Sequence, residues 1–243
     1  APNIERVMAT HRDIQWYWFI ACIAVLLVHF YVGPRVSDET QRENCVVNVH
    51  LPFDRGFSLN CDSPEFMRLA MNPSGLFEEK NTRQARPGLI VAAALVALPL
   101  ANLKMLGALG HAQRGDIAPE RIANALATFA PAYVAYVLLN IGILALAFWL
   151  FLEIVQPNNA FPWAAFLLLI YPITSFIGQP HTQMFNVLVP LFAIYGMQKP
   201  SAEWHGLFIG LGILSYGFFA VAAVCIGTAV IWKLSVRAFV TFA

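Results

Sequence analysis

The chain has 243 residues, of which 58% are hydrophobic and only 12% are charged, and its formal net charge at pH 7 is +1. Soluble domains carry about 25% charged residues, so the composition excludes an ordinary soluble domain and indicates an integral membrane protein. The near-neutral charge argues against a nucleic-acid partner, because proteins that bind nucleic acids carry a basic surface.

The N-terminal segment 1–13 is polar, and the first apolar run covers residues 14–33. A helix needs roughly 20 apolar residues to cross a bilayer, so we expect segment 1–13 in the cytoplasm and a membrane-spanning helix at 14–33. No small-residue cleavage site accompanies this run, which favours a retained span over a signal peptide. The sequence stops soon after its last apolar run, and we expect it to be a fragment or a shortened form of a longer protein.

The part of the chain at 87–243 is predicted to be a membrane domain with five further apolar runs, at about 87–107, 122–155, 161–178, 184–197 and 206–232. The expected fold class is therefore all-α, a polytopic bundle of about six transmembrane helices. The run at 122–155 is longer than a bilayer is thick, so we expect it to tilt or to bend near Pro131. We expect Asn140 to hydrogen-bond across helices, and Gly206 and Gly210 to pack closely within the chain or toward a partner subunit.

Basic residues in short connections predict the orientation, because they favour the cytoplasmic side. They lie after the second run and after the last one: Lys104, Arg114, Arg121, Lys233 and Arg237. Both termini are then cytoplasmic, the run at 122–155 is parallel to the first run, and Lys199 is an exception on the outer side. The predicted localisation is the bacterial inner (plasma) membrane, with loop 34–86 on the periplasmic or extracytoplasmic side.

Loop 34–86 holds 15 of the 29 charged side chains of the chain. No Asp or Glu lies in the middle of an apolar run. Pumps and coupled transporters keep ionisable groups at membrane depth, so this distribution argues against both classes. Any polar site is therefore expected in the outer loop.

Two cysteines of this loop, Cys45 and Cys61, enclose "VVNVHL", which has strand-like composition, and "FDRGF", which has turn chemistry. We expect a β-hairpin closed by a disulfide, worth about 3 kcal/mol in the chain-entropy model. The alternative is two free thiols. Cys22 and Cys225 lie within apolar runs and are expected to be inert core thiols.

The stretch "DSPEFMRLAM" predicts a short amphipathic helix that Asp62 or Ser63 caps. Phe66, Leu69 and Ala70 share one face of it, so we expect this helix to lie on the membrane surface. Farther along, "NTRQARPG" brings arginines to the start of the second run. Arginines at an interface pair well with phosphates, either those of a substrate or those of lipid headgroups.

The span, the loop with "D-S-x-E-[FY]-x-x-L-A", and the "R-P" at the start of the next span resemble the N-terminal part of GT-C glycosyltransferases. The later "GQPHTQMFNVLVPLFAIYGM" resembles the polar break and short span of many such enzymes, so the resemblance covers about 14–197. It implies a polytopic enzyme that uses a polyprenyl-phosphate-linked sugar as donor, with an acidic residue in the first outer loop. That acid acts as a general base or positions a divalent cation and the acceptor; the sequence itself has no metal signature.

Carried over by position, the resemblance implies that Asp62 is the catalytic acid, with Asp38 and Glu39 as the alternatives. Arg83 and Arg86 would hold the donor phosphate, and Glu65 is counted with them as substrate-binding. His181 and Gln183 fit a joint site less well, because the predicted orientation puts them on the opposite face. GT-C enzymes continue through further spans, so a second function remains open: a non-catalytic accessory subunit that binds other membrane subunits and lipids.

Overall fold

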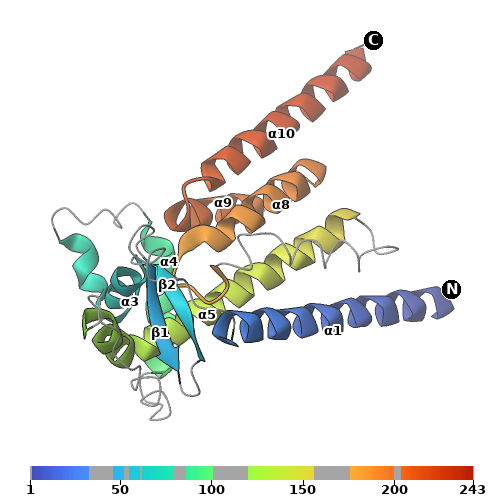
Figure 1. Ribbon diagram of the computed structural model, residues 1–243. Coiled ribbons are helices and arrows are strands. Elements are labelled where there is room, and N and C mark those ends of the chain that lie inside the picture. The colour runs from blue at the N-terminus through green and yellow to red at the C-terminus, as the bar shows by residue number, and fades with distance from the viewer. Residues whose placement is uncertain are drawn as a thin grey trace.

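The computed structural model describes the backbone of residues 2–32, 46–51, 55–60, 62–78, 86–100, 120–155, 176–199 and 204–242. These residues are mostly helical, which confirms the coarse prediction from composition (Figure 1). The α-helices are α1 (Pro2–Val32), α3 (Ser63–Met71), α4 (Pro87–Leu100), α5 (Glu120–Val155), α8 (Phe185–Gln198), α9 (Trp204–Ser215) and α10 (Phe219–Phe242). The 3-10 helices are η1 (Pro73–Phe77) and η5 (Thr182–Met184), and the strands are β1 (Val46–Leu51) and β2 (Arg55–Asn60).

Two helices are long and apolar enough to cross a membrane, over Gln15–Val32 of α1 and Ala130–Val155 of α5. Three further apolar helices in the described part of the chain are shorter, at Pro87–Leu100, His205–Ser215 and Phe219–Lys233. Membrane association is therefore supported by two helices, whereas six spans remain a prediction. Most of the expected span at 161–178 lies outside the described residues.

The two strands pair antiparallel, with Val46 opposite Asn60 and Leu51 opposite Arg55. The buried Phe57 of β2 packs edge-on against Tyr31 of α1, at 5.1 Å between ring centroids. The strand pair is therefore held on the helices by an aromatic side chain. The residues between the strands, and Cys45 and Cys61 of the expected disulfide, lie outside the described residues. Cys22 and Cys225 are half-buried free thiols.

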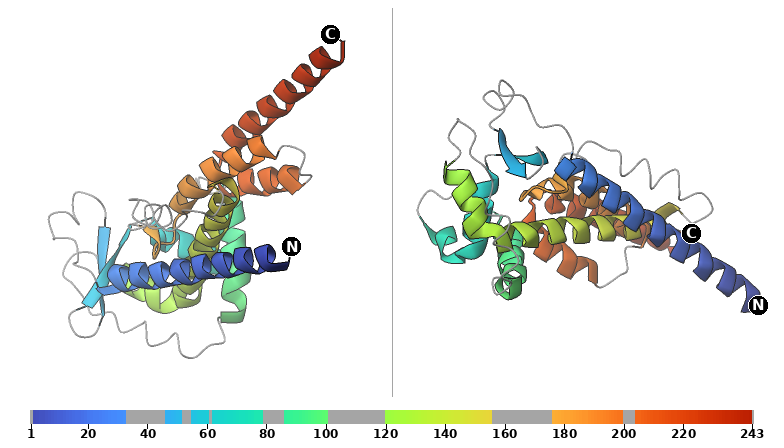
Figure 2. Two further views of the ribbon diagram at one scale, coloured as in Figure 1. Left: turned by 90° about the vertical axis from the view of Figure 1, so that its right-hand side faces the viewer. Right: turned by 60° about the horizontal axis from the view of Figure 1, so that its bottom comes forward.

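Helices α1 and α5 pack antiparallel. Phe19 stacks on Phe148 at 4.7 Å between ring centroids, and the hydroxyls of Tyr31 and Tyr133 lie 3.0 Å apart. Later residues of α1 thus meet earlier residues of α5, so the expectation that these two runs are parallel is wrong. The prediction assumed that every apolar run crosses the membrane, so that successive runs point in opposite directions. If one run does not cross, the predicted direction of every later run is inverted. Pro131 lies inside α5, and the first part of this helix runs at an angle to the rest (Figure 2).

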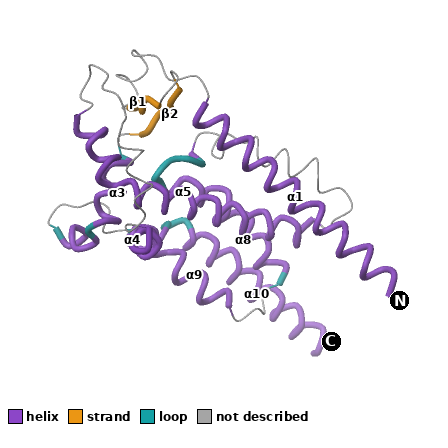
Figure 3. The backbone as a smooth tube through the Cα atoms, turned by 90° about the horizontal axis from the view of Figure 1, so that it is seen from below, coloured by secondary structure: helices purple, strands orange, loops and turns teal. Residues whose placement is uncertain are grey.

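The molecule has two distinct ends. The strand end carries β1, β2 and α3, and both termini lie on the opposite side (Figures 1 and 3). At this far end, Lys199 Nζ lies 3.4 Å from Glu153 Oε2, and Lys233 Nζ lies 3.4 Å from the carbonyl oxygens of Met197 and Gln198. The sequence predicted that Lys199 is an exception on the same side as the loop. In the structure it lies at the far end instead, together with Lys233.

The expected single span at 206–232 is two helices in the structure. α9 ends at Ser215, and α10 begins at Phe219 and folds back along it. The contact is close, because a Cβ added to Gly212 would lie 2.5 Å from the Phe219 ring. Hydropathy missed this break because the apolar composition continues across it. Gly206 and Gly210 have nothing within 4 Å of an added Cβ among the described residues, so they do not pack within this part of the chain.

The apolar face of α3 does not lie on a membrane surface, contrary to the prediction. Phe66, Leu69 and Ala70 are 2%, 0% and 3% exposed, and Met67 on the same helix is completely buried. α3 contacts α4 and α5. An amphipathic stripe indicates that a helix face is buried but does not say whether lipid or protein buries it, and here it is protein.

Candidate functional site

Asp62 stands at the N-terminus of α3, directly after β2. Its backbone N–H donates to Asn60 Oδ1 at 2.9 Å, and its carbonyl accepts from the Phe66 N–H at 3.2 Å. Proline in the first turn suits this start, because its missing N–H needs no partner there. The Asp62 carboxylate makes no capping hydrogen bond, and its side chain is 45% exposed. A second titratable group lies close to this carboxylate.

That second group is His181. Its Nε2 lies 3.9 Å from Asp62 Oδ2, and its side chain is only 12% exposed. The imidazole lies between two phenylalanine rings, with centroids 5.6 Å from Phe66 and 5.8 Å from Phe176. The expectation that His181 lies on the opposite face from Asp62 is therefore wrong. It followed from the same inverted directions as the error in α5.

Two polar residues of α5 form hydrogen bonds to the backbone next to Asp62 and His181. Tyr136 donates its hydroxyl proton to the carbonyl of Phe66 in α3 at 3.2 Å. Asn140 is completely buried, and its Nδ2 lies 3.2 Å from the carbonyl oxygens of Phe176 and Ile177 and 2.8 Å from that of Gln179. Residues four apart share one face of a helix, so one face of α5 positions both sides of the Asp62–His181 pair.

The hydrogen bonds of Asn140 confirm its expected structural role. Their acceptors belong to the backbone of segment 176–179, which the sequence could not show. A further bond from the Asn60 N–H to Gln179 Oε1, at 3.0 Å, joins this segment to the end of β2. The polar break "GQPHTQ" is therefore part of the strand end.

Arg86 is connected to the polar break through Tyr216. Its guanidinium carbon is 5.4 Å from the centroid of the Tyr216 ring, a cation–π arrangement. Tyr216 stacks on Phe185 at 5.7 Å and donates its hydroxyl proton to Asn186 Oδ1. Asn186 in turn donates through Nδ2 to Gln183 Oε1. The sequence had singled out Arg86 and Gln183 but not the tyrosine and asparagine that connect them.

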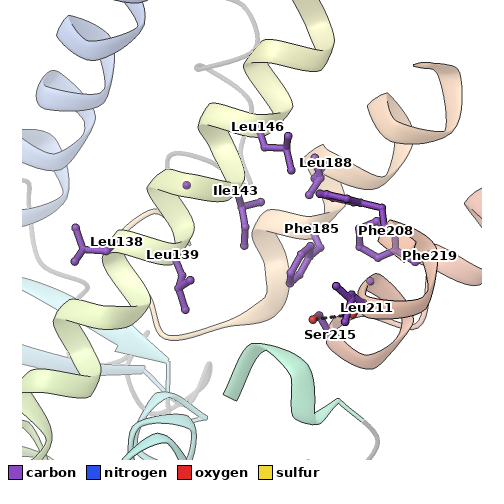
Figure 4. A pocket seen from close by; sticks show the side chains of 12 residues that line it. Leu138, Leu139, Ile143, Leu146, Phe185, Leu188, Phe208, Leu211, Ser215 and Phe219 are labelled. Atoms are coloured by element: carbon purple, nitrogen blue, oxygen red, sulfur yellow. Dashed lines mark hydrogen bonds between the residues drawn. The ribbon is translucent and has the colours of Figure 1, made fainter. Parts of the chain in front are cut away.

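A groove of about 310 Å³ is lined in part by Phe185 and by Ser215, the sequence neighbour of Tyr216 (Figure 4). Its lining comes from α5, α8, α9 and α10, and includes Leu139 and Ile143 on one wall and Phe185 at the base. Ser215 is the one polar side chain among the described residues that line it. A Cβ added to Gly88, two residues after Arg86, would collide with the Ser215 hydroxyl, so this end of the groove meets the start of α4. No sequence pattern predicts the groove, because its lining comes from four separate helices.

Segment 181–186 separates the acid from the arginine. His181 faces Asp62, while Phe185 and Asn186 contact Tyr216 beneath Arg86. A residue adds about 2.0 Å of rise in a 3-10 helix and 1.5 Å in an α-helix, so the two sides are roughly 8 Å apart along the backbone.

The other predicted site residues have different outcomes. Glu65 accepts two hydrogen bonds from Arg68, both 2.9 Å long, and Arg68 also reaches Glu78 at 3.3 Å. These bonds raise the pKa of Arg68 above its usual value. Arg83, Asp38 and Glu39 lie outside the described residues. Across the residues that the structure describes, no three His, Cys, Asp or Glu side chains gather as a metal site.

Comparison of the chain with family models, with curated proteins and with solved structures finds no match. The functional conclusion therefore depends on the residues and the geometry of the strand end.

Proposed function

We propose that the chain is a GT-C-like glycosyltransferase, or the N-terminal part of one, that takes its sugar from a polyprenyl-phosphate carrier at the outer face of a bacterial inner membrane. The observation that carries this proposal is the apolar groove lined by Ser215, whose sequence neighbour Tyr216 lies under the Arg86 guanidinium. Ligand pockets are mostly apolar with a few placed polar groups, and have volumes of about 300–1,000 Å³. A long hydrocarbon chain joined to a phosphate matches both parts.

In this mechanism the groove holds the part of the polyprenyl chain next to the phosphate. Arg86 binds the phosphate, since a guanidinium matches phosphate oxygens bidentately. Asp62 takes the proton of the acceptor hydroxyl, whose oxygen attacks the anomeric carbon of the sugar. The bond from that carbon to the phosphate oxygen breaks, and the phosphate leaves with the electron pair beside Arg86. Six spans and an outer position of loop 34–86 belong to this proposal.

The groove is tested by filling it. Neither Gly142, which lines the groove, nor Gly227, on α10 outside it, has an atom within 4 Å of an added Cβ. Gly142→Phe is expected to lower the affinity for polyprenyl monophosphate at least tenfold, because the new ring occupies the space of the chain. Gly227→Phe is the matched control and should bind as the wild type does. Binding is measured by native mass spectrometry of the protein in nanodiscs.

Two further variants separate binding from transfer. Arg86→Gln should weaken polyprenyl monophosphate roughly tenfold and leave binding of the uncharged polyprenol unchanged. Asp62→Asn should bind the carrier normally and lose transfer by 10²-fold or more, the usual contribution of a general base. Equal binding by the wild type and Gly142→Phe would contradict the role of the groove. Unchanged transfer by Asp62→Asn would contradict the role of the acid.

The accessory-subunit function keeps one observation in its favour. Gly206 and Gly210 leave an open strip on α9, where a helix of another subunit would approach closely. For this function, Gly206→Leu should abolish co-assembly with the partner subunit, whereas Asp62→Asn should leave it intact.

A further inference from the structure

Two lysines meet at the far end of the molecule, where α8 ends. Lys233 of α10 directs its Nζ at the carbonyl oxygens of Met197 and Gln198, both at 3.4 Å. Lys199, the residue after Gln198, has its Nζ 3.4 Å from Glu153 Oε2. The last turns of α5 and α8 therefore lie at the level of Lys233, and both lysines are exposed there.

Aromatic side chains lie beside these lysines. Trp232, directly before Lys233, is 73% exposed. Lys199 Nζ lies 5.1 Å from the centroid of the Tyr195 ring, and the Trp149 ring of α5 is 5.8 Å from that of Tyr195. Tryptophan and tyrosine gather where a bilayer meets water, and lysines there lay their apolar stems along the protein and direct the ammonium group to the headgroups. This combination indicates a membrane–water interface at the far end.

The two long apolar helices support the same position of the interface. Phe19 of α1 stacks on Phe148 of α5, and Gln15 and Glu153 lie a further turn or so toward the far end. At 1.5 Å per residue, the apolar stretch of α1 that begins at Gln15 is about 27 Å long, and that of α5 is about 39 Å long. A hydrocarbon core about 30 Å thick that begins at the far end therefore ends near the strand end.

The charge of the far end selects the kind of lipid. Basic residues favour the cytoplasmic side, and Lys199 lies at the same end as Lys233 and both termini (Figure 1). The cytoplasmic leaflet carries anionic lipids. An ammonium group has three N–H donors, and Glu153 competes only weakly for Lys199, because an exposed ion pair contributes little. An anionic headgroup therefore complements the two lysines.

We propose that the far end binds the headgroup of an anionic phospholipid of the cytoplasmic leaflet. Lys199 and Lys233 contact the phosphate of this lipid, and Trp232 lies at the level of its glycerol backbone. None of these residues belongs to the strand end. The inference is therefore independent of the proposed function and applies equally to an accessory subunit.

The site is tested by native mass spectrometry of the full chain, purified in detergent and titrated with phosphatidylglycerol or phosphatidylcholine. The wild type is expected to bind phosphatidylglycerol more tightly. The double variant Lys199→Gln/Lys233→Gln should weaken phosphatidylglycerol about 25-fold, since each lysine near an anionic surface contributes about fivefold in affinity, and should bind phosphatidylcholine nearly as the wild type does. Glu153→Gln should act in the opposite direction and tighten phosphatidylglycerol severalfold, because it removes the negative charge beside Lys199.

Two controls separate a site from an effect of net charge. Lys199→Arg/Lys233→Arg keeps both charges and should bind phosphatidylglycerol as the wild type does. Arg68→Gln removes a positive charge at the strand end and should also leave binding unchanged. The proposal is overturned by equal affinity of the wild type for the two lipids, by unchanged affinity in the double glutamine variant, or by a loss in Arg68→Gln as large as in Lys233→Gln. Displacement of phosphatidylglycerol by inorganic phosphate would also overturn it, because the site would then be one for the free anion.

Discussion

The two ends of the molecule are held together by different kinds of contact. At the strand end, the connections are buried rings and hydrogen bonds to backbone carbonyls, such as those of Tyr136 and Asn140. At the far end, Lys199 meets Glu153, and Lys233 meets the carbonyl of Met197, each through an exposed contact of 3.4 Å. Buried polar groups cannot exchange a lost partner for water, whereas exposed ion pairs can. The strand end is therefore expected to be the rigid one, as a site that positions a general base requires.

The largest loss of stability is expected from Asn140→Leu, which removes the buried hydrogen bonds at the strand end. The carbonyls of Phe176, Ile177 and Gln179 lose their common donor in apolar surroundings, and each buried polar group without a partner costs about 1–3 kcal/mol. Since part of this cost is relieved by relaxation, we expect a loss of about 3 kcal/mol. In a chain of this length that is roughly 6–12 °C in Tm, measured by thermal unfolding in detergent.

The matched control for this change is Thr228→Val on α10. Its hydroxyl bonds to the carbonyls of Val224 and Cys225 in its own helix, so no buried group is left without a partner. We expect less than about 0.5 kcal/mol, as for ordinary surface substitutions. Equal shifts in Tm for the two variants would refute the difference between the ends.

Gly178→Ala should act at the same end by steric overlap instead of lost hydrogen bonds. A Cβ at Gly178 would overlap the ring of Phe30, which itself packs against Tyr31 and Phe57. Overpacking a filled site costs about 1–3 kcal/mol, so we expect about 2 kcal/mol and a Tm lower by roughly 4–8 °C. Gly217→Ala meets nothing within 4 Å and is the control. If both variants melt alike, α1 does not pack against segment 176–179.

These contacts show which parts of the structure the sequence could predict. Helix content, α3 and the strand pair's segments follow local patterns of apolar residues and turn residues, and α3 begins at Ser63, although the Asp62 side chain does not cap it as its pattern predicted. The break between Ser215 and Phe219 leaves no such pattern, because the residues on both sides are equally apolar. Local patterns determine helices, but they do not determine how helices meet.

The candidate site illustrates the same limit. Asp62 and Arg86 were found from short motifs, and His181 was noticed in a polar break but assigned to the wrong face. Its pairing with Asp62 joins residues 119 positions apart and depends on the direction of every helix between them. One inverted run was enough to separate the two residues in the prediction. Tyr216 was missed because an aromatic residue in an apolar run gives no signal of a polar role.

The smallest effect is expected at the far end, from breaking the ion pair of Glu153 and Lys199. Their side chains are 25% and 53% exposed, and exposed pairs contribute about 0–1 kcal/mol. A double-mutant cycle with Glu153→Gln and Lys199→Gln isolates the coupling of the two charges from other effects of each change. We expect a coupling below about 0.5 kcal/mol that disappears at 1 M salt, where the Debye length is roughly 3 Å. Because Lys199 also lies over the Tyr195 ring, Lys199→Gln alone should cost slightly more than the coupling itself.

A coupling above about 1.5 kcal/mol that persists in high salt would mean that the pair of Glu153 and Lys199 is shielded from water. The far end would then be as firmly held as the strand end, and rigidity would no longer distinguish the site.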